Sequence, residues 1–265
     1  MDYQNLDPER VKRAKKISAG PLGKELAKFP LRFAKAAFFG DRPTKQKTQN
    51  VNQGTVTLLE LNGRPIALTC SHVLDAYRRI HANPNVIFQI GDLEFNPLER
   101  IIDESESSKL DIVTIDLQGL NLKELIGPEE IGSSFFTPVQ WPPKSIQQGE
   151  FVAFGGFPGV LRQNVSWYEM IFESWSSGAT QVSSVREEYF VCKFEREYWV
   201  ESFNIHGHDG LDLHKLGGLS GGPVFIHRNI YWEFIGMIYE FSEDFDLMYV
   251  RPAKLVLEDG TILKE

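Results

Sequence analysis

The sequence predicts an all-β protein of the sandwich or barrel type, preceded by a basic helical arm. From residue 50 onward the apolar residues follow a strand-like period, and many short apolar runs are separated by glycine and proline. We find no alternation of strands with helices, which argues against a parallel α/β sheet. The 265 residues suffice for one large domain or two small ones, and a core of this size needs no disulfide or metal.

The arm is expected over residues 1–49. Residues 1–50 hold 12 Lys and Arg against 5 Asp and Glu, whereas the whole chain has a net charge of -8. We predict two short helices over residues 8–39, interrupted at Gly20-Pro21. The second helix is expected to pack on the protein's own body. A membrane-surface helix and a docking segment for a regulatory partner stay open as alternatives.

Short strands are expected in two clusters, over residues 50–120 and 149–265, with a connector over residues 121–148. Asn62-Gly63 predicts a two-residue hairpin turn within the first cluster. A short helix is expected shortly after residue 70. The individual strands are expected at residues 55–61, 64–69, 86–90, 110–117, 151–154, 181–185, 189–194, 223–227, 232–239 and 247–250.

The most specific signal is a glycine-rich turn at residues 217–225, which reads GGLSGGPVF. A serine hydroxyl is a poor nucleophile at neutral pH. It needs a base, a group that orients the base, and donors for the oxyanion. Because glycine tolerates positive φ, Gly218 can present its N–H beside that of Ser220 to one oxygen. We therefore predict Ser220 as a nucleophile, with the backbone of Gly218 and Ser220 as its oxyanion hole.

Two residues upstream are candidates for the base and its orienting acid. His72 directly follows the strand expected at residues 64–69, so a rigid element would hold its imidazole. Asp111 opens an apolar strand, where a carboxylate must be solvated or paired, and a histidine N–H would serve as its partner. Asp103, in an acidic loop, and Asp116, deeper in the strand pattern, compete with Asp111 for this role.

These segments, TCSH at 69–72, DIV at 111–113 and GLSGGP at 218–223, resemble the signatures of trypsin-like serine proteases, in the chain order His, Asp, Ser. Residues 151–159 resemble the bacterial branch of that superfamily. The resemblance covers roughly residues 50–255. It implies two antiparallel six-stranded β-barrels with the site between them. It also implies a serine endopeptidase that hydrolyses polypeptides through an acyl-enzyme. The positions that the resemblance places at the specificity pocket are His214, Tyr239, Glu240 and Phe241.

The chain departs from this family beside the serine. Digestive members have an aspartate there, which pairs with a newly cut N-terminus, whereas this chain has Leu219. That route of activation is therefore absent, and the turn needs another anchor. The alternative function is a protease-like regulatory or binding module, inactive or active only with a partner. Esterase activity with the same three residues is a further alternative.

Cys70 and Cys192 are expected to be free thiols in a reducing compartment. We find no secretory signal and no run that approaches about 20 apolar residues, so the expected location is the cytoplasm. The acidic body argues against nucleic acid as a partner, and no cofactor is expected. A loop before the serine turn holds metal-ligand residue types, but its spacing favours a solvated loop, so no metal is expected. The residues of this loop are His206, His208, Asp209, Asp212 and His214.

Overall fold

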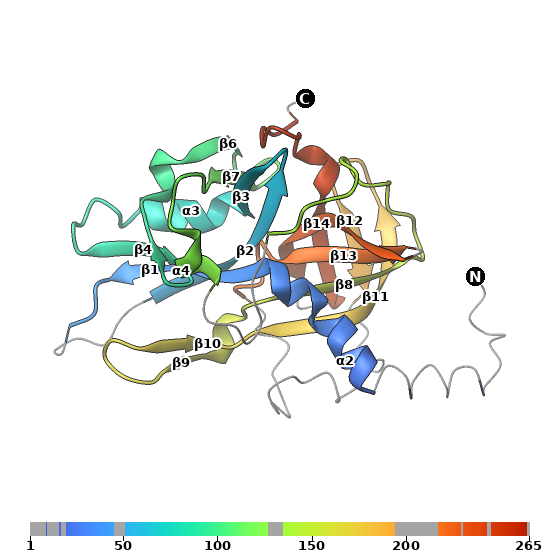
Figure 1. The fold of residues 1–265 in the computed structure, drawn as a ribbon, viewed down its shortest axis with the longest axis horizontal. Coiled ribbons are helices and arrows are strands. Elements are labelled where there is room, and N and C mark those ends of the chain that lie inside the picture. The colour runs from blue at the N-terminus through green and yellow to red at the C-terminus, as the bar shows by residue number, and fades with distance from the viewer. Residues whose placement is uncertain are drawn as a thin grey trace.

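The computed structural model describes residues 20–44, 51–126, 135–193, 217–228, 230–242 and 245–263, together with Glu9 and Lys16. The protein consists of two antiparallel β units that lie side by side (Figure 1). The first is a seven-stranded sheet with the strand order β5-β4-β1-β2-β3-β7-β6, and the second is a closed barrel of six strands in the order β11-β12-β15-β14-β13-β8. The predicted mostly-β architecture is thus confirmed.

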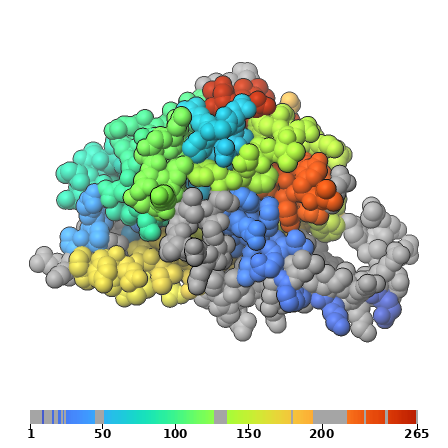
Figure 2. All heavy atoms as spheres, in the orientation of Figure 1, coloured from blue at the N-terminus to red at the C-terminus, as the bar shows by residue number. Residues whose placement is uncertain are grey.

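The first sheet is formed by β1 (Ala34–Asp41), β2 (Val51–Leu61), β3 (Arg64–Thr69), β4 (Val86–Ile90), β5 (Leu93–Glu94), β6 (Ile101–Ser105) and β7 (Ile112–Asp116). The barrel is formed by β8 (Phe151–Gly156), β11 (Trp175–Val185), β12 (Phe190–Lys193), β13 (Pro223–Arg228), β14 (Tyr231–Ser242) and β15 (Leu247–Pro252). The separate hairpin of β9 (Arg162–Asn164) and β10 (Met170–Phe172) extends below the first sheet (Figure 1, Figure 2). The α-helices among the described residues are α2 (Pro21–Lys28), α3 (Ser71–Arg78) and α4 (Leu122–Ile126).

Strand β1 corrects the sequence analysis. We predicted helix through residue 39, but α2 ends at Lys28 and a 3₁₀ helix, η2 (Phe29–Phe33), leads directly into β1. β1 lies inside the sheet between β2 and β4 and is buried along most of its length. A strand covered on both faces lacks the alternation of apolar and polar residues that marks a half-buried strand, so its period resembled that of a helix.

The prediction of two six-stranded barrels is therefore confirmed for the second unit and not confirmed for the first. The first unit takes β1 from the segment that we expected to be an arm, and this gives it seven strands. Its terminal strands, β5 and β6, are not paired with each other, so the described sheet stays open. The hairpin prediction is confirmed, because β2 and β3 are joined at Asn62 and Gly63 with φ of 49° and 73°.

The described part of the N-terminal segment packs on the barrel. The ring of Phe29 stacks on Trp232 with 4.5 Å between centroids, and Phe33 contacts Phe225 at 5.4 Å. The core of the first unit continues into the junction, where it includes Phe225, Phe234 and Met237 of the barrel strands. None of the helices among the described residues has the length and apolar character needed to cross a membrane. Packed elements of both units therefore meet at the junction that carries the candidate site.

Candidate active site

His72 and Asp111 meet at the edge of the first unit. His72 is the second residue of α3, and Asp111 immediately precedes β7. One carboxylate oxygen, Oδ2, lies 2.7 Å from Nδ1 of the imidazole, and the other, Oδ1, accepts the main-chain N–H of His72 at 2.9 Å. The Asp111 side chain is 8% exposed and that of His72 is 45% exposed. The buried carboxylate thus holds the ring through Nδ1, while nearly half of the His72 side chain stays exposed.

The backbone around Asp111 is shaped for this contact. Asp111 has φ of 55°, a left-handed conformation that aspartate tolerates better than most residues. Its N–H donates to the Glu106 carbonyl at 3.1 Å. The Ser71 hydroxyl lies 2.6 Å from the Ser105 carbonyl and 3.0 Å from the Ile112 carbonyl, so the residue before the histidine is tied to the strand ends on either side of Asp111. This tie holds the two segments in register.

The two competing aspartates have other partners. Asp116 pairs with Arg64 at 2.5 Å, and this hydrogen bond holds the pKa of the carboxyl below its usual range. Asp103 accepts the N–H of Ile262 at 3.0 Å. Of the three aspartates, only Asp111 has a hydrogen bond to His72.

The serine turn precedes β13 and depends on its glycines. Gly218 and Gly221 have φ of 103° and 92°, in the region that favours glycine. A β-carbon on Gly221 would overlap the carbonyl oxygen of Thr55, and one on Gly218 would lie 2.8 Å from the Phe157 carbonyl oxygen. Gly222 has no more room, because its β-carbon would lie 2.5 Å from the Gly155 carbonyl oxygen. Each of these positions needs glycine for space, and the first two also need it for conformation.

Hydrogen bonds from β2 tie this turn to the first unit. The N–H of Thr55 donates to the Ser220 carbonyl at 2.9 Å, and its hydroxyl donates to the Gly218 carbonyl at 2.7 Å. The hydroxyl of Thr57 donates to the Gly221 carbonyl at 2.7 Å. Both threonines are fully buried. Sequence analysis missed their role, although hydroxyls at alternate positions of an apolar strand need buried partners and could have indicated it.

Leu219 supplies the anchor that the sequence left unassigned. Its side chain is 2% exposed and belongs to the core of the barrel, together with Phe154 and Val224. The side chain also covers Gly156, where a β-carbon would lie 2.9 Å from Leu219 Cδ2. Burial of a leucine side chain is worth about 1.5–3 kcal/mol. The turn is therefore held by apolar burial on the barrel side and by threonine hydroxyls on the other.

The Ser220 hydroxyl has its hydrogen bond with the Tyr239 carbonyl of β14, at 3.4 Å, and none with His72. Within the described part of the chain, the N–H groups of Gly218 and Ser220 donate to no acceptor. Gly54 lies between the serine turn and the start of α3. A β-carbon there would lie 3.6 Å from the Ser220 carbonyl oxygen and 2.8 Å from Val73 Cγ2. The nucleophile candidate and the His72 segment thus flank the same short stretch of β2.

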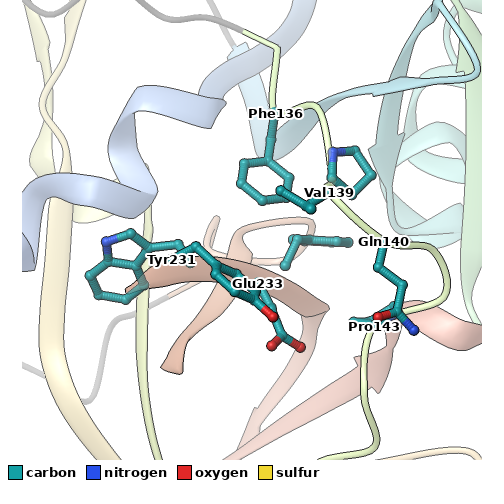
Figure 3. Close-up of a pocket in the computed structure, with 9 residues that line it drawn as sticks. Phe136, Val139, Gln140, Pro143, Tyr231 and Glu233 are labelled. Atoms are coloured by element: carbon teal, nitrogen blue, oxygen red, sulfur yellow. The ribbon is translucent and has the colours of Figure 1, made fainter. Parts of the chain in front are cut away.

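The predicted pocket residues are only partly described. His214 and the cluster at residues 206–214 lie outside the described residues. Glu240 is exposed near the end of β14, whereas Phe241 is half-buried and packs against the barrel core. A separate small cleft lies between the connector and the β13–β14 hairpin, where Phe136, Val139 and Glu233 are among its lining (Figure 3). This cleft includes no candidate catalytic or pocket residue.

Both cysteines are buried thiols. Burial, followed by the nearby Asp111 carboxylate, raises the pKa of Cys70 well above its usual value, so its thiol is protonated at neutral pH. Cys70, His72 and Asp111 present ligand atoms within 4.8 Å of one another. Because both oxygens of Asp111 already accept hydrogen bonds from His72, this group fits a histidine–carboxylate pair better than a metal centre.

No protein-family model matches the chain, and no curated protein matches it either. Among solved structures, the chain is similar to the active form of the Rv3671c protease from M. tuberculosis. The identity is 13%, the TM-score is 0.44, and the match covers 88% of this chain and 82% of that one. It is also similar to the thermostable serine protease AL20 from an extremophilic microorganism, at 10% identity and a TM-score of 0.44, over 83% and 91% of the two chains. The candidate site is therefore defined by the residues and contacts of this chain alone.

Proposed function

We propose that the protein is a serine endopeptidase that hydrolyses polypeptides through an acyl-enzyme on Ser220. The observation that carries the proposal is the two-point contact of the Asp111 carboxylate with the ring and main chain of His72. An ionised carboxylate only accepts hydrogen bonds, so it selects the tautomer with a proton on Nδ1. Nε2 is then the unprotonated nitrogen, and it is available as a base.

The proposed reaction follows from this arrangement. Ser220 Oγ attacks the scissile carbonyl while His72 Nε2 accepts the hydroxyl proton. His72 then returns that proton to the departing amine, and water releases the acyl group by the same route. For this reaction the serine hydroxyl turns from the Tyr239 carbonyl toward His72. The bond to the Tyr239 carbonyl is long, at 3.4 Å, so little is lost when the hydroxyl turns.

The same proposal assigns the oxyanion hole to the N–H groups of Gly218 and Ser220. Both donors lack an acceptor among the described residues. The peptide planes that contain these N–H groups are restrained through their carbonyls, because the Gly217 carbonyl accepts the N–H of Gly159 at 2.7 Å and the Leu219 carbonyl accepts that of Gly222 at 2.8 Å. Preorganised donors of this kind are each worth about 10²–10³ in kcat.

A fluorophosphonate probe tests the proposal without knowledge of the substrate. Folded wild-type protein is expected to be labelled once, on the peptide that contains Ser220, and heat-unfolded protein is expected to stay unlabelled. Mass spectrometry of the digest locates the adduct. A label on another serine would show that the proposed nucleophile is wrong. Folded protein that stays unlabelled both alone and after a partner or lysate is added would refute the proposed hydrolysis.

Removing the Thr55 hydroxyl tests the support of the oxyanion hole. Thr55→Val keeps the side-chain shape but deletes the bond to the Gly218 carbonyl and the acceptor of the Phe157 N–H. We expect kcat to fall by about 10–10²-fold, because the serine turn loses a tie at Gly218, the residue that carries one of the two oxyanion donors. Thr114→Val is the matched control, since this buried hydroxyl donates to the distant Gly260 carbonyl at 2.6 Å. Equal kcat values for the two variants would count against a role for Thr55 in the turn.

A second candidate is a protease-like module that is active only with a partner, or not at all. The bond of the Ser220 hydroxyl to Tyr239 rather than to His72 favours it. Probe labelling that begins only after a partner or a cell lysate is added would support the conditional form. Parallel assays on peptide and ester substrates separate endopeptidase from esterase activity.

A further inference from the structure

Arg251 is a buried cation on β15 whose contacts reach both units. Its side chain is 8% exposed. Nη2 donates to the Lys109 carbonyl at 2.8 Å, across the junction, and Nη1 donates to the Glu188 carbonyl at 3.2 Å. The third nitrogen, Nε, is buried and has no hydrogen-bond partner among the described residues. An apolar side chain would avoid this desolvation, so packing alone does not account for an arginine here.

The carbonyl that Arg251 holds lies two residues before Asp111. Asp111 adopts a left-handed conformation, which persists only where the surroundings impose it. The N–H groups of Lys109 and Asp111 both donate to the Glu106 carbonyl, at 2.9 and 3.1 Å, so the turn is closed from one side. Arg251 closes it from the other side. The direction in which the Asp111 carboxylate leaves the chain therefore depends on a residue of the barrel.

The same guanidinium covers Tyr239. Its Cζ lies 3.9 Å from the centroid of the ring. Burial raises the pKa of Tyr239 to about 12, so the ring is neutral at neutral pH and presents its face to the cation. The carbonyl of Tyr239 is the group that accepts the Ser220 hydroxyl. The Arg251 side chain thus contacts both the turn that leads to Asp111 and Tyr239, whose carbonyl accepts the Ser220 hydroxyl.

We propose that Arg251 is a positioning residue for the hydrolysis. It holds the Lys109 carbonyl so that Asp111 is aimed at His72, and it fixes Tyr239 beside Ser220. The inference rests on the proposed function. Arg251 touches no reacting atom, and its effect is expected to pass mainly through Asp111.

A double-mutant cycle with Asp111 tests this route. Arg251→Met keeps an unbranched side chain but removes both donors and the charge. We expect it to slow fluorophosphonate labelling of the otherwise wild-type protein about 10²-fold, as small misplacements of catalytic groups do. In the Asp111→Asn background the same substitution should change the rate by about twofold at most, because the orientation is already lost. Arg251→Lys, which keeps the charge without the fork of donors, should give an intermediate loss.

Arg228→Met is the matched control. Arg228 is also a largely buried arginine on a barrel strand, and it pairs with Glu150 and Glu233 at 2.8 and 3.0 Å. The Arg228→Met variant should have a lower melting temperature than the wild type but the same rate of fluorophosphonate labelling. The inference is overturned if Arg251→Met labels within threefold of wild type, or if it slows labelling equally with and without Asp111. Should Arg251→Met fail to fold, Arg251→Lys decides by the same comparison. A folded wild type that is never labelled would instead refute the proposed function.

Discussion

Replacing Ser220 by alanine is expected to lower kcat for peptide cleavage about 10⁶-fold, the size of the loss seen when a serine nucleophile is removed. The substitution removes one oxygen, whose single hydrogen bond is long at 3.4 Å, so the fold should be nearly unaffected. The measurement is the rate of cleavage of a peptide library, with the melting temperature recorded for both proteins. The library also reports which side chains are accepted beside the scissile bond.

A double substitution tests whether Ser220 and His72 act together in one catalytic unit or contribute independently to kcat. Adding His72→Ala to Ser220→Ala should cost almost nothing more, because the base has no nucleophile left to activate. Losses that multiply would show that His72 acts on something other than Ser220. A Ser220→Ala protein that retains wild-type cleavage would refute the acyl-enzyme.

Asp111→Asn should lower kcat about 10⁴-fold while the fold is kept. An asparagine oxygen can still accept the main-chain N–H of His72, as Oδ1 of Asp111 does at 2.9 Å. Its NH₂ group then faces Nδ1, which lies 2.7 Å from Oδ2 in the wild type. A donor opposite Nδ1 selects the tautomer whose proton sits on Nε2, and that nitrogen can no longer act as a base. Single-turnover cleavage and circular dichroism together measure the two expectations.

Asp116→Asn is the control for the loss of a nearby carboxylate charge, because Asp116 ends β7, the strand that Asp111 immediately precedes. Asp116 pairs with Arg64, which holds the pKa of its carboxyl below the usual range. The pair therefore stabilises the fold at neutral pH, and this stabilisation fades as the pH falls through the lowered pKa. The control should lose some stability at neutral pH and keep its kcat. Equal losses of kcat in the two variants would remove Asp111 from the proposed mechanism.

The strands could be predicted largely because local signals agreed with the fold. The bounds expected for β3 and β4, residues 64–69 and 86–90, are those of the structure, because turn residues flank both strands. Asn62-Gly63 set the hairpin between β2 and β3. β1 was missed because it is covered on both faces, a property of the sheet rather than of the segment. The short β5, β9 and β10 carried too few residues for a periodic pattern, and β6 is half-buried along its whole length, so it shows no alternation.

The residues of the candidate site that lie in a recognisable local motif could be predicted from the sequence. Those that act through contacts with residues far away in the chain could not. The glycines around Ser220 and the strand ends at His72 and Asp111 are visible in the sequence. Thr55 lies 163 residues from Gly218, whose carbonyl it holds, and Arg251 lies 142 residues from Lys109. Neither pair has a local pattern that could reveal it. Leu219 marked a missing ion pair, but its burial in the barrel core depends on tertiary packing.

The bond from the Thr55 amide to the Ser220 carbonyl has a consequence for how the protein opens. The amide proton of Thr55 can exchange with solvent only when the serine turn leaves β2, and the two threonine hydroxyls must be released in the same event. Undocking of the two units and disassembly of the nucleophile's surroundings are then one cooperative opening. Mild denaturant or pressure that separates the units should abolish hydrolysis at Ser220 while each unit still retains its own secondary structure.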